Sequence, residues 1–464
     1  MKITVESSKV VKPAYGGGDA PATTFIPLTV FDLISFDEYM FGVHAFHPPS
    51  PPTAALEAGL ATALADYREW AGRLRVDPST ARRGILLNDA GVRFVEAAAD
   101  AALDGAAPLQ PTPEVRRFHP RADGGCDGEL MLVQVTRFPC GSLVVGHAMH
   151  HAVGDGFAIA QFLVAWGQAT RGVAIDPAPV HDRASLFVPR HPPRVEFEHR
   201  GAEFIKPPHD KTKKKTESAR PVSGAGSDDD EVVIEQVRFS REFIAELKSR
   251  ASSAGAPGGR PYSTAQCLAA HLWRCATRAR GGHAGAGDAT TTTTLHLAVN
   301  GRARMRGPGG VPEGYTGNAV LWAHPSATAR DLVAWSLGRA AELVRGAAAG
   351  VDDAYFRSFI DFASSGAVEE EGLVPPLADP EAALGADVAV YCLLRVPFYG
   401  VDFGGGRQFL YTPGYYPAEG VVYILPPSPL GDGSVEAHVS LFRRAMETFK
   451  SCCFSVGDGD SGPN

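Results

Sequence analysis

A polar segment near the middle of the chain constrains the possible folds most, because it divides the chain into two halves of similar length that can each form a domain. Residues 206–231 run from a lysine-rich block through Pro, Gly and Ser to four consecutive acidic residues. This composition buries too little apolar surface to offset the entropy lost on ordering, so we expect a flexible crossover, although the basic run could also bind phosphate. The 464 residues suffice for two or three cores. We predict domains at 1–205 and 232–456, this linker between them, and a disordered tail at 457–464.

Strands and helices alternate along both halves. Two apolar runs separated by Pro139-Cys140-Gly141 predict a hairpin of strands over 130–138 and 142–149. The segment 156–170 is apolar on nearly every side and predicts a buried helix. Further strands are predicted over 232–239, 295–299, 388–397 and 421–425, and further helices over 241–251 and 263–280. The fold class is therefore α/β (α+β), with two halves of similar size.

Charge and cysteine content exclude several classes of protein. The formal net charge of −8 argues against a general nucleic-acid binder, which normally presents a basic face. The seven cysteines form no CxxC pair, so a zinc ribbon is not expected. The N-terminus lacks the apolar core of a signal peptide, and no run of 18 apolar residues could span a membrane. We expect a cytoplasmic protein.

Three histidines and an aspartate lie where a predicted strand meets the buried helix, namely His147, His150, His151 and Asp155. His147 and His151 have the spacing of a helical zinc site, but Ala148 stands where that motif needs glutamate, so we expect no metal. Hydrogen-bonded core histidines are the plainest alternative, above all for His147 and His150. We favour a third role, a general base, because an imidazole pKa near 6.5 suits proton removal at neutral pH.

Two motifs in this chain resemble those of the plant BAHD acyltransferases. The segment His151-Ala152-Val153-Gly154-Asp155-Gly156 resembles the HxxxDG motif, and Asp402-Phe403-Gly404-Gly405-Gly406 resembles DFGWG. Three shorter segments, 28–32, 300–304 and 315–318, are also similar to the family's opening, DxRxR and YxGN segments. The doublet of His150 and His151 is shared with peptide-synthetase condensation domains, but no carrier or adenylation region accompanies it. The sequence as a whole most resembles the grass branch of this family, which transfers hydroxycinnamoyl groups to amines.

The resemblance implies two chloramphenicol-acetyltransferase-like domains with a solvent channel between them. His151 would be the catalytic base in mid-channel, and Asp155, followed by Gly156, would be structural through an ion pair with Arg302. Asp402 and Gly404 would shape a loop. Acyl-CoA would be a co-substrate, no cofactor would be permanently bound, and the protein would be a monomer acting on small molecules. Gly405 stands where the family has tryptophan and Asn300 where it has aspartate, which weakens the roles of those two positions.

Substrate contacts are predicted less directly. Lys248, on the helix over 241–251, and Ser263, at the start of the next helix, are candidates for binding the phosphates of CoA, because a helix N-terminus favours anions. Arg302 is a third candidate. Tyr391 and Arg395 are candidates for the acceptor pocket. The predicted strand that leads to the DFG loop, 387–395, carries no carboxylate beyond Asp387. This favours an aromatic monoamine such as tryptamine or tyramine over agmatine or putrescine.

The predicted reaction is transfer of a hydroxycinnamoyl group from CoA to an amine. No GxSxG motif accompanies the histidine, so we expect direct transfer without an acyl-enzyme. The alternative is O-acylation of an alcohol such as shikimate or quinate, whose carboxylate Arg395 could bind. A non-catalytic binder of acyl-CoA is a third possibility, motivated by Gly405.

Overall fold

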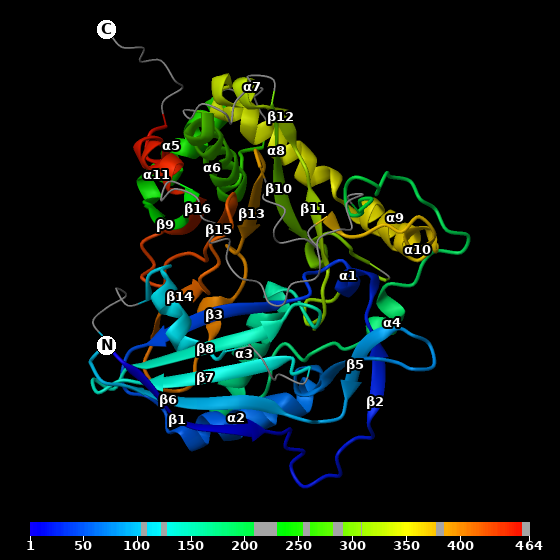
Figure 1. The fold of residues 1–464 in the computed structure, drawn as a ribbon, viewed down its shortest axis with the longest axis vertical. Helices are drawn as coiled ribbons and strands as arrows, with labels where there is room; N and C mark the ends of the chain where they lie inside the picture. The colour runs from blue at the N-terminus through cyan, green and yellow to red at the C-terminus, as the bar shows by residue number, and fades with distance from the viewer. Residues whose placement is uncertain are drawn as a thin grey trace.

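The computed structural model describes residues 1–103, 109–121, 128–207, 230–253, 260–281, 291–307, 309–376 and 385–456. These residues form two lobes, each built on a sheet (Figure 1). Most of the expected linker, 208–229, and the expected tail, 457–464, lie outside the described residues, so both stay predictions. The mixed α/β class expected from the sequence is confirmed.

The first sheet has the strand order β1-β6-β7-β8-β3-β14. Its strands are β1 (Ile3–Val11), β6 (Val92–Ala99), β7 (Met131–Arg137), β8 (Leu143–His150), β3 (Tyr39–Phe46) and β14 (Gln408–Pro413). Helices α2 (Thr53–Asp66) and α3 (Gly156–Thr170) pack against one face of this sheet. The segment 113–118 covers the other face of β8, where Gly146 gives it room to pass. Every residue of β8 is therefore buried.

One strand of the first sheet comes from the second half of the chain. β14 pairs antiparallel with β3, with Tyr411 opposite His44, and so lies beside a strand that precedes it by more than 360 residues (Figure 1). The side chains of Phe398, Phe403 and Tyr411 belong to the first lobe's core. The predicted division of the chain at residue 231 assigns the segment 398–413 to the second domain, but in the structure this segment packs with the first lobe.

The second sheet has the order β11-β10-β13-β15-β16-β9, with β12 paired to β10. Its strands are β11 (Val320–Ala323), β10 (Thr292–Asn300), β13 (Val388–Cys392), β15 (Val421–Ile424), β16 (Val435–Phe442), β9 (Val232–Phe239) and β12 (Ser326–Thr328). One face packs on α5 (Arg241–Ser253), α6 (Thr264–Gly281), α8 (Leu337–Gly350) and α11 (Arg443–Cys453). Because side chains alternate along a strand, the other face carries the remaining set. That face bears His296, Trp322, Tyr391, Tyr423 and His438.

The smaller elements complete the two lobes. A third sheet of order β2-β5-β4 is formed by β2 (Thr24–Pro27), β5 (Arg83–Leu87) and β4 (Arg73–Val76). The short or peripheral helices are α1 (Val30–Leu33), α4 (Arg183–Leu186), α7 (Ala329–Ala334), α9 (Asp353–Ala363) and α10 (Ala367–Glu370). Among the described helices, none has the length and apolarity that a bilayer crossing requires.

The strand expected over 388–397 is wrong at its C-terminal end. β13 stops at Cys392, and a turn follows in which the Val396 amide donates to the Leu393 carbonyl at 2.9 Å. The last ladder bond runs from the Leu393 amide to the Ile424 carbonyl at 2.8 Å, and the turn then takes the chain away from β15. Arg395 consequently lies exposed beyond the strand.

Candidate active site

His151 lies in the turn between β8 and α3. β8 ends at His150, and α3 begins at Gly156 with Asp155 as its N-cap. The Asp155 carboxylate accepts hydrogen bonds from the amides of Phe157 and Ala158 at 3.1 and 3.0 Å. A carboxylate at this position satisfies free helix amides and suits the helix dipole. The local sequence therefore fixes where the strand stops, where the helix starts and which residue stands between them.

Contacts from distant parts of the chain fix the backbone of this turn. The His151 amide donates to the Glu38 carbonyl at 2.9 Å, and the His151 carbonyl accepts from Nδ2 of Asn318 at 2.8 Å. The Val153 carbonyl accepts from the Arg183 guanidinium. Segments before β3, after α3 and in the second half of the chain thus hold His151 in one position.

The imidazole of His151 is half-buried. It lies beside the ring of Phe36, with 5.7 Å between ring centroids, and its Nδ1 is buried without a hydrogen-bond partner in the described residues. Burial lowers the pKa of His151 below 6.5, while the carboxylates of Asp155 and Asp32 act in the opposite direction. A lowered pKa keeps this imidazole neutral near pH 7, which is the state that accepts a proton.

The other two histidines of the cluster are core residues. His147 and His150 lie on β8 and are 2% and 8% exposed. His147 packs against His44, with 5.4 Å between ring centroids, and burial lowers the pKa of each of the pair. The core interpretation considered for these two positions therefore fits the structure. Among the described residues, no group of three or more His, Cys, Asp or Glu could hold a metal ion.

Asp155 forms the ion pair with Arg302 that the sequence analysis expected. Its Oδ2 lies 2.8 Å from Nη1 of Arg302, and both side chains are 4% exposed. The same carboxylate oxygen accepts from the Ala319 amide at 3.0 Å. Nη2 of Arg302 donates to the carbonyls of Tyr315 and Gly317, each at 2.8 Å. These contacts bury the Arg302 guanidinium and use its donors. The CoA-binding role predicted for Arg302 is therefore corrected to a structural one.

Sequence reasoning missed a second buried ion pair next to the first. Asp32 pairs with Arg183 at 2.8 Å and accepts from Nδ2 of Asn318, also at 2.8 Å. Thr29 and Asp32 hydrogen-bond each other's amides in a capping box that starts α1. Asp32 and Asn318 belong to segments 28–32 and 315–318, whose resemblance to the family could have pointed to them. The sequence held no comparable signal for Arg183.

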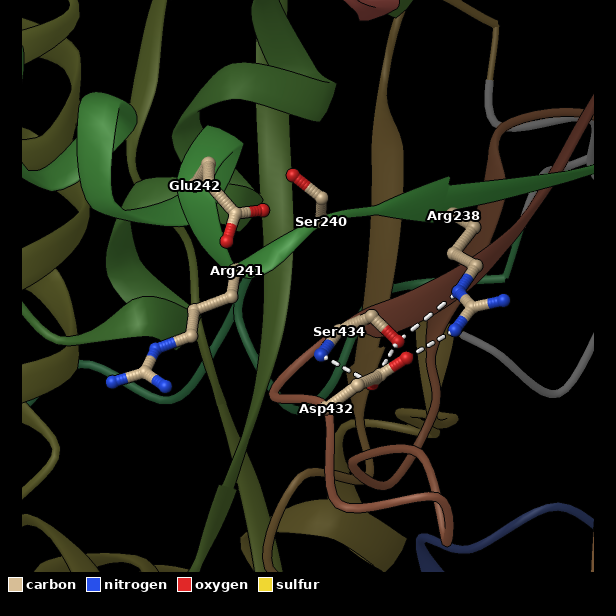
Figure 2. Close-up of a pocket in the computed structure, with 6 residues that line it drawn as sticks. All are labelled: Arg238, Ser240, Arg241, Glu242, Asp432 and Ser434. Carbon is tan, nitrogen blue, oxygen red and sulfur yellow. Dashed lines mark hydrogen bonds and ion pairs between the residues drawn. The ribbon is translucent and has the colours of Figure 1, made fainter.

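A cavity of about 310 Å³ opens elsewhere, at the start of α5 (Figure 2). Its lining residues are Arg238, Ser240, Arg241, Glu242, Asp432 and Ser434. Arg238 already pairs with Asp432 and donates to Ser434 Oγ at 3.1 Å. The lining includes no residue of the His151 turn, so this cavity is not the candidate active site.

A family model described as the Transferase family matches residues 1–453. Agmatine coumaroyltransferase-1 of Hordeum vulgare is 56% identical over 460 residues, which cover 98% of this chain and 100% of that protein. The chain belongs to the BAHD acyltransferases. The sequence-based assignment to that family is confirmed, and the protein is an acyl-CoA-dependent acyltransferase that takes the CoA thioester as its co-substrate.

Other relatives of this acyltransferase span nearly the same length. Putrescine hydroxycinnamoyltransferase 3 of Oryza sativa subsp. japonica is 45% identical, over 98% of this chain and 100% of its own. Tryptamine hydroxycinnamoyltransferase 2 of the same organism is 36% identical, over 98% and 99%. Vinorine synthase, a solved structure, is 19% identical and has a TM-score of 0.70 over 97% of this chain and 98% of that one. At that identity the likeness shows the fold alone.

The DFG loop of this acyltransferase docks onto the first lobe. Asp402 lies 3.2 Å from Nη1 of Arg171 and accepts from the Gly404 amide at 2.8 Å. Gly404 has φ of +79°, a left-handed conformation that disfavours other residues. A Cβ on Gly405 would lie 2.5 Å from the carbonyl oxygen of Pro49. The tight packing therefore leaves no room at this position for the family's tryptophan.

The remaining substrate contacts predicted for this acyltransferase stay predictions. Ser263 caps α6 reciprocally: its Oγ accepts from the Gln266 amide at 3.2 Å, and its amide donates to Oε1 of Gln266 at 2.8 Å. Lys248 is half-buried on α5. Gly156 has open space beside it, since a Cβ there would meet nothing within 4 Å. Space is therefore available where α3 begins, next to the His151 turn.

Proposed function

We propose that this acyltransferase transfers a hydroxycinnamoyl group from CoA to the primary amine of agmatine, with His151 as the general base. The observation that carries the catalytic part is the His151 imidazole, half-buried, of lowered pKa and fixed by backbone hydrogen bonds from two other segments. The relative at 56% identity, an agmatine coumaroyltransferase, supports the donor and the acceptor. We expect the enzyme to be a cytoplasmic monomer whose acceptor and CoA meet in a channel at His151.

In this reaction the base takes up one proton from the amine and later returns it to the leaving thiolate. A free alkyl ammonium has a pKa near ~10 and must first lose a proton to water. The neutral amine then attacks the thioester carbonyl carbon, forming a C–N bond while His151 takes the second proton. The tetrahedral oxyanion collapses, the C–S bond breaks, and CoA leaves as a thiolate. The imidazolium returns its proton to that thiolate, so the products are the amide, CoA and neutral His151.

We propose agmatine as the acceptor ahead of the aromatic monoamines, which the sequence of the strand around Tyr391 favours. That preference depended on the absence of a carboxylate on β13 itself. Identity falls from 56% to 45% and 36% as the relatives' acceptors change from agmatine to putrescine to tryptamine. We therefore place a cationic amine first, and no observation favours O-acylation of shikimate or quinate over it.

The test is thioester loss with coumaroyl-CoA and a panel containing agmatine, putrescine, tryptamine and shikimate. We expect agmatine to be used best. His151→Ala should lower kcat by about 10²–10⁴-fold, the range that general base catalysis contributes. His191→Ala, which changes an exposed histidine, should keep the wild-type rate. A wild-type rate in His151→Ala, or consumption of shikimate ahead of every amine, would refute the proposal.

A further inference from the structure

Glu38 is an acidic residue directly beside the catalytic turn. Its carbonyl accepts the His151 amide at 2.9 Å, and it immediately precedes β3, whose first residue, Tyr39, pairs with His150. Its side chain is half-buried. Glu38 is therefore fixed next to His151 through the backbone, on the segment that leads into β3.

The Glu38 carboxylate has no ion-pair or hydrogen-bond partner among the described residues. Its neighbour Asp37, in contrast, pairs with Arg83 and lies 3.7 Å from Nε2 of His150. Burial and the charge of Asp37 raise the pKa of Glu38, which shows that the ionised form lacks compensation. A cation that binds beside a half-buried carboxylate of this kind stabilises its ionised form.

Tyrosines from β13, β15 and the segment after β14 form an aromatic group on the side of the second sheet that carries Tyr391. Tyr391 stacks on Tyr423, with 5.1 Å between ring centroids, and meets Trp322 edge to face at 5.3 Å. Burial raises the pKa of Tyr416 to about 12, and the charge of Glu38 contributes. The Gly414 amide donates to the Phe41 carbonyl at 2.8 Å, so the chain that follows β14 and carries Tyr416 runs beside the start of β3, next to Glu38. Burial raises the pKa values of Tyr391 and Tyr423, and the charge of Glu38 contributes to both.

The Glu38 carboxylate and the reacting imidazole have different surroundings. The carboxylates that act most on His151 are Asp155 and Asp32, whereas Glu38 acts on the tyrosines of the opposite lobe. Glu38 thus shares a backbone hydrogen bond with His151, but its carboxylate is not paired with the imidazole, whose Nδ1 has no partner among the described residues. An acid surrounded by aromatic faces is the combination that binds ammonium and guanidinium groups.

We propose that Glu38, with Tyr391, Tyr416 and Tyr423, forms the subsite that binds the distal positive charge of a cationic acceptor. This inference rests on the proposed function and names the residues that select the acceptor. The carboxylate neutralises the distal charge while the amine at the other end of the acceptor meets His151. An acceptor with an uncharged tail gains nothing from Glu38.

The experiment compares acceptors that differ in the charge of their tail. Agmatine and hexylamine are assayed with coumaroyl-CoA on wild type, Glu38→Gln and the matched neighbour Asp37→Asn. Glu38→Gln should lower kcat/KM for agmatine at least tenfold and leave hexylamine within about twofold. Asp37→Asn should keep the wild-type preference. An equal loss for both acceptors in Glu38→Gln, or no loss for either, overturns the subsite while leaving the proposed function intact.

A second measurement uses the wild-type enzyme alone, in case Glu38→Gln folds poorly. Butylguanidine carries the distal cation but no reactive amine, and butylurea is its uncharged counterpart. Butylguanidine should inhibit competitively with agmatine and at least tenfold more strongly than butylurea. Equal inhibition overturns the subsite. Failure of the wild type to acylate any amine instead refutes the proposed function and this inference with it.

Discussion

At the scale of single residues, neighbouring histidines have different roles because of where the strand ends. His150 is the last residue of β8 and is buried, whereas His151 lies in the turn and keeps part of its surface exposed. Burial lowers the pKa of both, but only His151 combines a neutral imidazole with a position that an acceptor could reach. One step along the chain thus separates a core residue from the residue that we propose as the base.

The lowered pKa of His151 predicts the pH dependence of the reaction. Protonation removes the base, and a pKa below 6.5 moves that loss to lower pH than for an ordinary histidine. Expressed per unprotonated acceptor, kcat/KM should be flat from neutral pH down to 6.5 and fall below it. Initial rates with coumaroyl-CoA across the pH range measure this. An inflection above pH 6.5 would contradict the neutral, desolvated imidazole.

At the scale of elements, the start of α3 combines a helix cap with a buried ion pair. One oxygen of Asp155 caps the helix and the other holds Arg302 and the Ala319 amide. Arg302 follows β10, so this carboxylate connects the His151 turn of the first lobe with the second sheet. The position of His151 therefore depends on an arginine about 150 residues away.

Asp155→Asn separates the two functions of this side chain. The amide oxygen can still cap α3, but the Arg302 guanidinium is left buried without its counter-ion. Breaking one side of a buried pair costs about 3–5 kcal/mol, so we expect a loss of that size in the free energy of unfolding. Urea denaturation followed by circular dichroism measures it. The double variant Asp155→Asn with Arg302→Leu should recover part of the loss, and no recovery would argue against the ion pair as the cause.

At the scale of the whole molecule, the chain returns to the first lobe after building most of the second. β14 extends the first sheet, and the DFG loop before it inserts Phe403 into the first lobe's core. Phe403 is 4% exposed and packs against Trp166 and Phe46, with centroid distances of 4.8 and 5.4 Å. The two lobes are therefore held together by packing as well as by the continuous chain.

Phe403→Ala tests whether this docking stabilises the first lobe. Removing a buried aromatic ring costs about 3–5 kcal/mol, because the lost burial adds to the cavity that is left. We expect a loss of that size in the free energy of unfolding, measured by urea denaturation with tryptophan fluorescence. Phe454→Ala is the matched control, since Phe454 is 55% exposed, and should cost much less. Equal effects of the two variants would show that the docking contributes little.

The sequence by itself determined the local elements and the chemistry of the turn. Apolar periodicity placed α3 and β9 at their observed bounds, and the doublet of His150 and His151 followed by Asp155 marked the junction between strand and helix. These features are encoded within a few residues, because backbone periodicity and capping act over one or two turns. The pairing of Asp155 with Arg302 was accessible only through the family's resemblance.

Only the tertiary structure decided which distant residues complete the site. Glu38 and Asn318 reach the His151 backbone from segments more than 100 residues away, Arg183 contacts the same turn from α4, and β14 joins a sheet begun at the other end of the chain. Composition and spacing do not encode such contacts, because each depends on how two packed surfaces fit after both have folded. Glu38, the carboxylate that we propose binds the distal charge of the acceptor, likewise lies beside His151 only because the fold brings the segment before β3 to that turn.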